Sequence, residues 1–137
     1  MRAALLVVAL SACGGPNKPE TPRLEKENQI TSLWTQIREF RQRAGMRVEP
    51  LPADVMSMAP RTVNQAEQVC PDGHEVPPTC SDICSLADAI CDNAETICTI
   101  ADELGKQDDY AQDKCKSAKA SCKEGKERCC GCPAVQP

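Results

Sequence analysis

Apolar residues recur at helical spacing in the first third of the chain. Between residues 24 and 44 they fall at steps of three and four: Ile30, Leu33, Trp34, Ile37 and Phe40. This period places them on one face of a helix, and Gly45 is suited to end it. The sequence therefore predicts an amphipathic helix over residues 24–44.

The other face of this helix is basic towards its end. Arginine occurs there at four positions: Arg38, Arg41, Arg43 and Arg47. Such a face fits a membrane surface or an anionic partner. Alternatively, the arginines face solvent, and the apolar stripe of the same helix packs against the rest of the protein. We favour this second interpretation, because the chain offers no other apolar cover for its cysteine-rich half.

A seven-residue period governs the second half of the chain. Cysteine recurs at this step in two series, which are Cys84, Cys91, Cys98 and Cys115, Cys122, Cys129. Seven residues are two helical turns, so each series follows one face of a helix. We predict antiparallel helices over about residues 81–104 and 108–130, the first capped by Ser81 or Asp82 and ended by Gly105. Three stacked disulfides then form: Cys84–Cys129, Cys91–Cys122 and Cys98–Cys115.

Small residues flank these cysteines on both predicted helices. They are Ala87, Ala94, Ala101, Ala111, Ala118 and Gly125. A disulfide holds its two Cα atoms only about 5.5 to 6 Å apart, closer than the roughly 8 to 10 Å between helix axes packed through large side chains. Small side chains are what this approach requires. Charge favours the same pairing, because residues 81–104 carry six acids and no base while the second helix is rich in lysine.

Four further cysteines lie at the open end of this hairpin. Continuing the ladder pairs Cys80 with Cys132, and elimination pairs Cys70 with Cys130. Spacing does not separate this arrangement from the one in which Cys130 and Cys132 exchange places.

The first helix of the hairpin also carries a column of large apolar residues beside the seam: Ile83, Ile90, Ile97 and Leu104. If exposed, they would form a contiguous apolar strip. We expect the helix over residues 24–44 to cover it through Leu33, Trp34, Ile37 and Phe40, giving a small three-helix bundle. The alternative is that the eight residues form an interaction strip covered by an envelope protein or by a second copy of the chain.

The remaining segments lack a clear period. Residues 48–69 contain three prolines, so we expect a linker, with a short helix at most over residues 61–69. Residues 71–79 are typical of turns, and the lone His74 is expected to be an exposed turn residue.

The N-terminus has the pattern of an export signal. Met1 and Arg2 precede the apolar run Ala3–Leu10, which is too short to span a bilayer. The run ends in Leu10-Ser11-Ala12-Cys13. These residues resemble the lipobox of bacterial lipoproteins. The resemblance implies a signal peptide over residues 1–12 and a lipid on Cys13, with fatty acids such as palmitate.

The same resemblance implies a location in the bacterial cell envelope. Gly14 and Gly15, with no aspartate after Cys13, fit the outer membrane, facing the periplasm or the surface. Residues 13–23 would then be a lipidated tether that binds the membrane through Cys13. The cysteine count agrees, because reserving one of eleven for lipid leaves ten that can all pair.

Composition limits the function. Three aromatic residues in 137 are too few for a conventional core, and so many cysteines indicate a disulfide scaffold in an oxidising compartment. We expect an all-α protein with an amphipathic helix over 24–47, a cysteine-rich hairpin over 70–132 and a tail over 133–137.

We expect this protein to be a non-enzymatic structural or interaction module without cofactor or nucleic-acid partner, since no catalytic motif is visible. The alternative is a bundle that binds copper or zinc through thiolates. A third function, thiol–disulfide exchange, would favour a Cys-x-x-Cys at a helix start. The nearest patterns are Cys80-x-x-x-Cys84 and Cys129-Cys130-Gly131-Cys132, so a reducible bond in this terminal cluster stays open.

Overall fold

The structure is a computed structural model that describes residues 21–133. Within this range the protein is all-helical, with no strands. Its elements are α1 (Pro22–Arg43), α2 (Pro52–Met58), α3 (Val63–Glu67), the 3-10 helix η1 (Pro78–Cys80), α4 (Ser81–Leu104) and α5 (Asp109–Cys130). The predicted signal peptide, Cys13, most of the tether and residues 134–137 lie outside the described residues.

Helices α4 and α5 form the predicted antiparallel hairpin. Gly105 ends α4 with a φ of 93°, a left-handed conformation that glycine adopts without steric cost. The Asp108 side chain caps α5 by accepting a hydrogen bond from the backbone N–H of Ala111 at 3.1 Å. Gln112 Nε2 donates to the carbonyl oxygens of Ala101 and Gly105, at 3.0 and 3.3 Å. These two bonds join the start of α5 to the end of α4 and to the turn between them.

The start of α4 differs from the prediction. Neither Ser81 nor Asp82 caps it, since both lie inside the helix. Cys80 occupies the N-cap position without a side-chain hydrogen bond to the helix. The physical reason is the preceding turn Pro78–Cys80, in which the Cys80 N–H bonds to the carbonyl of Pro77 at 2.8 Å and leads the chain directly into the helix.

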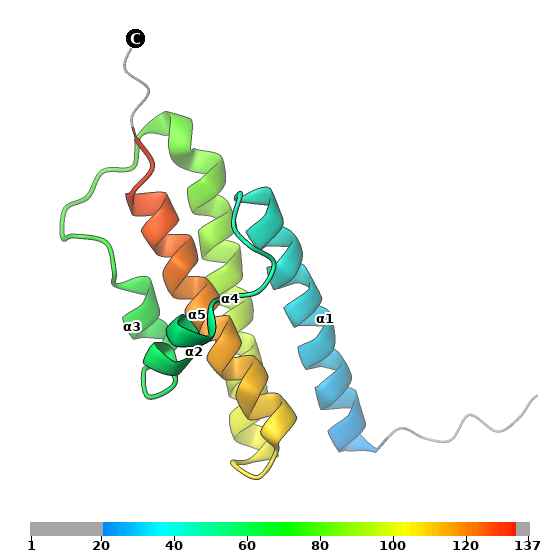
Figure 1. Cartoon of the computed structure of the whole chain (residues 1–137). Helices are drawn as coiled ribbons and strands as arrows, with labels where there is room; N and C mark the ends of the chain where they lie inside the picture. Colours follow the sequence, from blue (N-terminus) through cyan, green and yellow to red (C-terminus); the bar gives the residue numbers. More distant parts are fainter. Residues whose placement is uncertain (1–20, 134–137) are drawn as a thin grey trace, which may run out of the picture.

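The other helices cover the hairpin from two sides (Figure 1). Helix α1 lies along α4 and α5, while α2 and α3 pack against α5 on the other side. Thr21 caps α1, and Pro22 occupies its first turn, where a missing N–H costs nothing. The prediction that a helix near residues 24–44 packs on the hairpin is confirmed.

The segment predicted to be a linker contains two short helices. Pro52 begins α2 rather than interrupting it, because proline is favoured at the first helical position. Thr62 and Gln65 form a reciprocal capping box at the start of α3, inside the stretch where a short helix was predicted. Met58 and Ala66 are buried, which fixes both helices to the hairpin.

One lysine of α5 holds the junction between these two helices. Lys119 Nζ donates to the carbonyl oxygens of Ala59 and Arg61, at 2.8 and 2.7 Å. Burial lowers the pKa of Lys119, with a further lowering from the neighbouring charge of Lys116 and an opposing effect of Asp102. The side chain therefore ties α2 and α3 to α5 and is not part of a solvated basic face.

Candidate functional site

A ladder of disulfides is the central feature of the hairpin. Its three inner bonds join Cys84 to Cys129, Cys91 to Cys122 and Cys98 to Cys115, the pairs expected from the heptad spacing. Their Cα–Cα distances are 4.7, 4.6 and 4.7 Å, near the lower end of the range that disulfides span. The backbones of α4 and α5 are therefore very close along their whole length.

Small residues make this approach sterically feasible. Ala87, Ala94, Ala101, Ala111, Ala118 and Gly125 are all buried. At Gly125 the contact is tight, because a Cβ added there would lie 3.3 Å from Cα and 3.4 Å from Cβ of Ala87. A methyl group at this level would therefore require Ala87 to shift by a few tenths of an ångström.

Two outer disulfides close the open end. Cys80 is bonded to Cys132 and Cys70 to Cys130, with Cα–Cα distances of 6.1 and 5.6 Å. This is one of the two arrangements that the spacing left open. All ten cysteines from residue 70 to residue 132 are paired, so none of them offers a free thiol in this state.

Charge contributes less to the hairpin than the sequence suggested. Within residues 21–133, Lys126–Asp88 is the one ion pair that joins α4 to α5. The other lysine pairs of α5 lie within the helix, namely Lys116–Asp113 and Lys123–Glu127. On α4, Glu103 pairs instead with Lys26 of α1, at 2.6 Å. The short disulfides bring the backbones together, and most lysine pairs of α5 then form within that helix rather than across to α4.

The apolar strip considered for interaction is mostly internal. Ile90 and Ile97 of α4 are fully buried, as are Ile30 and Ile37 of α1, and Trp34 is 5% exposed. Partial exposure is confined to the remaining members: Leu33, Phe40, Ile83 and Leu104. Within this fold the strip is not a free docking surface, because α1 occupies it.

Polar contacts fix α1 at both of its ends. Near the turn of the hairpin, Arg23 Nη2 lies 3.1 Å from Oδ2 of Asp108, the residue that also caps α5. Near the open end, Arg128 Nε donates to the carbonyl oxygen of Ala44 at 2.6 Å. These contacts set the position of α1 along the hairpin, which a plain apolar stripe would leave free to slide.

The expectation that the arginines of α1 form a solvated face is wrong for Arg41. This side chain is fully buried, and its Nη2 lies 2.6 Å from Oε2 of Glu124 on α5. Its Nε donates to the carbonyl oxygen of Arg47 at 2.8 Å. Arg41 follows Ile37 by four residues, so it continues the apolar stripe into the interface. Arg41 Nη1 and Glu124 Oε1 are buried without a hydrogen-bond partner.

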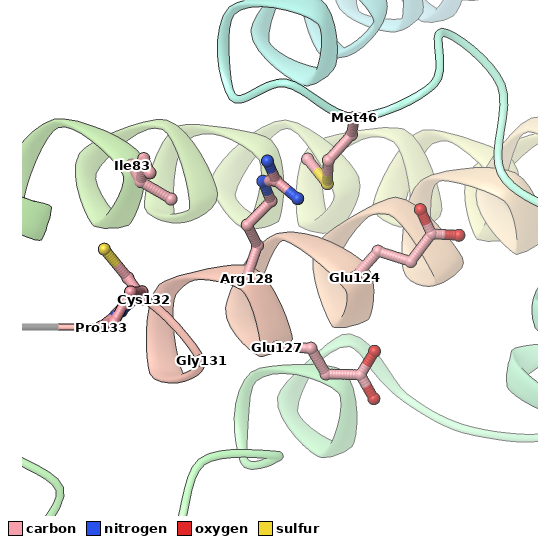
Figure 2. A pocket seen from close by; sticks show the side chains of 8 residues that line it. All are labelled: Met46, Ile83, Glu124, Glu127, Arg128, Gly131, Cys132 and Pro133. Carbon is pink, nitrogen blue, oxygen red and sulfur yellow. The ribbon is translucent and has the colours of Figure 1, made fainter.

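A cavity of about 530 Å³ opens at the free end of the hairpin. Figure 2 shows the residues that line it, which come from α4, α5 and the segments following α1 and α5: Met46, Ile83, Glu124, Glu127, Arg128, Gly131, Cys132 and Pro133. Glu124 is paired with Arg41, and Glu127 with Lys123. Arg128 has no carboxylate partner among residues 21–133, so it supplies the unbalanced charge of the cavity. Sequence reasoning missed this cavity, although it had placed Cys132 at the open end.

One group of side chains has the composition of a metal site. A carboxylate oxygen of Glu67 and the sulfurs of Cys91 and Cys122 lie within 4.8 Å of one another. The two sulfurs are, however, bonded to each other. A disulfide sulfur is a poor metal ligand compared with a thiolate, so this group could bind a metal only after reduction. His74 is exposed in its turn, as expected.

We compared the chain with known protein families, curated proteins and solved structures. No family model matches the chain, and no curated protein or solved structure is significantly similar to it. Among the helices of residues 21–133, none combines the length and apolar character needed to span a bilayer.

Proposed function

We propose that this protein is a non-enzymatic lipoprotein of the bacterial cell envelope that presents a rigid, disulfide-bonded helical body as a structural or interaction module. The observation that carries this proposal is the set of five disulfides, three of which join α4 to α5 while two close the open end of the hairpin. Such a construction resists unfolding where disulfides persist, which is outside the cytoplasm.

The N-terminal sequence supports the anchored part of the proposal. Leu10-Ser11-Ala12-Cys13 would direct lipid attachment, and the residues from Cys13 to Thr21 would join the lipid to α1. Two or three acyl chains would hold the protein stably on a membrane, whereas one chain would not. The tether would then join the folded body at the N-terminal end of α1, near the turn of the hairpin.

The anchor is tested by expressing the full chain in a bacterium supplied with a palmitate analogue that can be detected after attachment. We expect label on the parent protein and recovery in the membrane fraction. Cys13→Ser should lose both. A matched control is the double variant Cys70→Ser/Cys130→Ser, which also lacks cysteines but keeps Cys13, and it should retain both. Labelled Cys13→Ser would refute the lipid anchor.

The scaffold is tested by the intact mass of the protein before and after reduction under denaturing conditions, on Cys13→Ser material. Five disulfides predict a gain of ten hydrogens. Ten thiols that react with an alkylating agent before any reduction would refute the scaffold.

If ten thiols react before reduction and the native protein contains bound copper or zinc, the alternative function of a thiolate metal-binding bundle would be supported. The residues Glu67, Cys91 and Cys122 would then be the first ligands to examine by substitution. Cysteine thiolates and a carboxylate are a ligand set that zinc accepts.

A further inference from the structure

The two halves of the Cys80–Cys132 disulfide have very different surroundings. Cys80 is fully buried at the N-terminal end of α4. Cys132 is partly exposed beyond the end of α5 and lines the cavity at the open end. Figure 2 shows its side chain turned towards α4, on the side where Ile83 lies. A small molecule in this cavity can therefore approach the sulfur of Cys132, whereas the protein covers that of Cys80.

No other disulfide combines these features. Cys91 and Cys122 are both buried, so their bond is shielded from both ends. In the Cys98–Cys115 and Cys70–Cys130 bonds both residues are partly exposed. In the Cys84–Cys129 bond Cys129 is buried and Cys84 is partly exposed, so this bond differs from Cys80–Cys132 only in lying away from the cavity. None of these cysteines lines the cavity. Only the Cys80–Cys132 bond therefore presents one accessible sulfur in a cavity and one covered sulfur behind it.

The buried half is the leaving group when Cys132 is attacked. Cys80 stands at the N-cap of a helix of 24 residues, where the unpaired backbone N–H groups create a partial positive charge. A helix N-terminus stabilises a thiolate, and a sulfur that is stable as a thiolate is displaced faster from a disulfide. The helix N-terminus acts in favour of a Cys80 thiolate, while burial and the Pro133 carbonyl oxygen, 3.8 Å from the Cys80 sulfur, act against it. Access decides the direction of the step, because an external thiol that attacks the Cys132 sulfur displaces the Cys80 sulfur.

The cavity also favours the attacking group. The reactive form of a thiol is its thiolate anion. Arg128 is the cavity residue whose charge is not balanced by a carboxylate, since Glu124 and Glu127 pair with Arg41 and Lys123. A cation beside the entry to Cys132 attracts an anion and raises its local concentration.

We propose that the Cys80–Cys132 disulfide is a site of thiol–disulfide exchange with a small external thiol. The thiolate enters the cavity and attacks the sulfur of Cys132. A new disulfide forms between the external sulfur and Cys132, the bond between Cys132 and Cys80 breaks, and its electron pair leaves with Cys80 as a thiolate. The external sulfur is oxidised and the Cys80 sulfur is reduced, so the step is balanced.

This exchange leaves the scaffold in place. The three inner disulfides and Cys70–Cys130 still join α5 to the rest of the protein. What changes is the open end, where the turn Pro78–Cys80 loses its bond to the segment after α5. The protein would thus carry one redox-responsive site on a body that does not unfold.

The experiment treats the fully oxidised chain with a limited amount of reduced glutathione, stops the reaction with acid and blocks free thiols by alkylation. Peptide mass spectrometry then locates both modifications. We expect glutathione on Cys132 and the alkyl group on Cys80, forming at least about tenfold faster than products of the other four bonds. A first adduct on any other cysteine, or simultaneous loss of several bonds, would overturn the proposal.

A pair of variants tests the cavity separately. Arg128→Gln removes the unbalanced cation, and Arg61→Gln removes an exposed arginine that does not line the cavity. We expect Arg128→Gln to slow exchange at Cys132 by about threefold at low salt, and Arg61→Gln to leave the rate unchanged. Equal rates for the two variants would refute the role of Arg128.

Discussion

Helix α4 is packed on two neighbours by opposite means. Towards α5 it presents cysteine and alanine, and covalent bonds hold Cα atoms 4.6 to 4.7 Å apart at the inner levels. Towards α1 it presents isoleucine, and the contact consists of large apolar side chains. A buried ion pair, Arg41–Glu124, joins α1 to α5 beside this contact. One helix thus carries a covalent face and a hydrophobic face.

The difference shows how a chain with three aromatic residues can fold. Small residues bury little apolar area, so the α4–α5 interface gains little from the hydrophobic effect alone. Disulfides compensate by limiting the freedom of the unfolded chain. The few large residues are then used on α1, where no covalent bond exists. The two interfaces should therefore respond differently to reduction and to substitution.

Reduction should have the largest effect. Each inner disulfide contributes roughly 3 kcal/mol in the chain-entropy model, and the three together approach about 9 kcal/mol. Because small domains are stable by only about 5 to 15 kcal/mol, we expect the reduced chain to lose most of its helical circular dichroism at room temperature. Retention of native helix content after complete reduction would show that packing alone holds the hairpin.

Shortening a buried side chain of α1 should have the second largest effect on stability. Ile37→Ala removes a fully buried side chain and should cost about 3 kcal/mol. We expect faster hydrogen exchange in α1 but unchanged protection in α4 and α5, since the disulfides still hold them. Thr35→Ala, at an exposed position of the same helix, is the control and should leave both unchanged. Equal loss of protection in all three helices would contradict the division into two interfaces.

Removal of one member of the buried ion pair Arg41–Glu124 should have the third largest effect on stability. Arg41→Met leaves Glu124 in the interface without its partner, and we expect a loss of about 2 to 3 kcal/mol. We expect a smaller loss of stability than for a fully buried ion pair, because the Glu124 side chain is 20% exposed and water can partly solvate its charge. Arg41→Met/Glu124→Met should recover most of the loss, because no unpaired charge then remains.

Chemical denaturation of the oxidised protein measures these differences. The control is Arg38→Met, which breaks an exposed pair with Glu49 and should cost less than about 1 kcal/mol. A double variant as unstable as the single one would mean that Arg41 acts through packing rather than charge.

Enlargement of the tight contact should have the smallest effect. Gly125→Ala gains about 1 kcal/mol of helix propensity but places a methyl group 3.3 Å from the Ala87 backbone. The disulfides on either side prevent α4 from moving away, so we expect a net loss of about 1 kcal/mol. Thermal unfolding of the oxidised protein tests this value. A more stable Gly125→Ala protein would show that the hairpin can adjust despite its disulfides.

Much of the hairpin could be predicted from the sequence. The seven-residue cysteine step fixes the partners of Cys84, Cys91 and Cys98, because a helix repeats its face every two turns. Gly105 and the small residues beside the cysteines follow from the same geometry. These features are local or periodic, so they do not depend on how the rest of the chain folds.

Other features depended on the tertiary structure. Arg41 is polar by type, and only the position of Glu124 on a distant helix makes its burial favourable. Helix α2 is too short to be recognised from its pattern and lies in a segment that contains three prolines. It is stabilised by the burial of Met58 and by Lys119. The cavity at Cys132 arises where segments far apart in sequence meet.

The sequence by itself therefore determined the register of the hairpin, since covalent pairing at a fixed period allows one solution. The tertiary structure decided which face α1 covers, which polar groups are buried and which disulfide is accessible. Those outcomes depend on contacts between elements, and the energy of each contact depends on both of its partners.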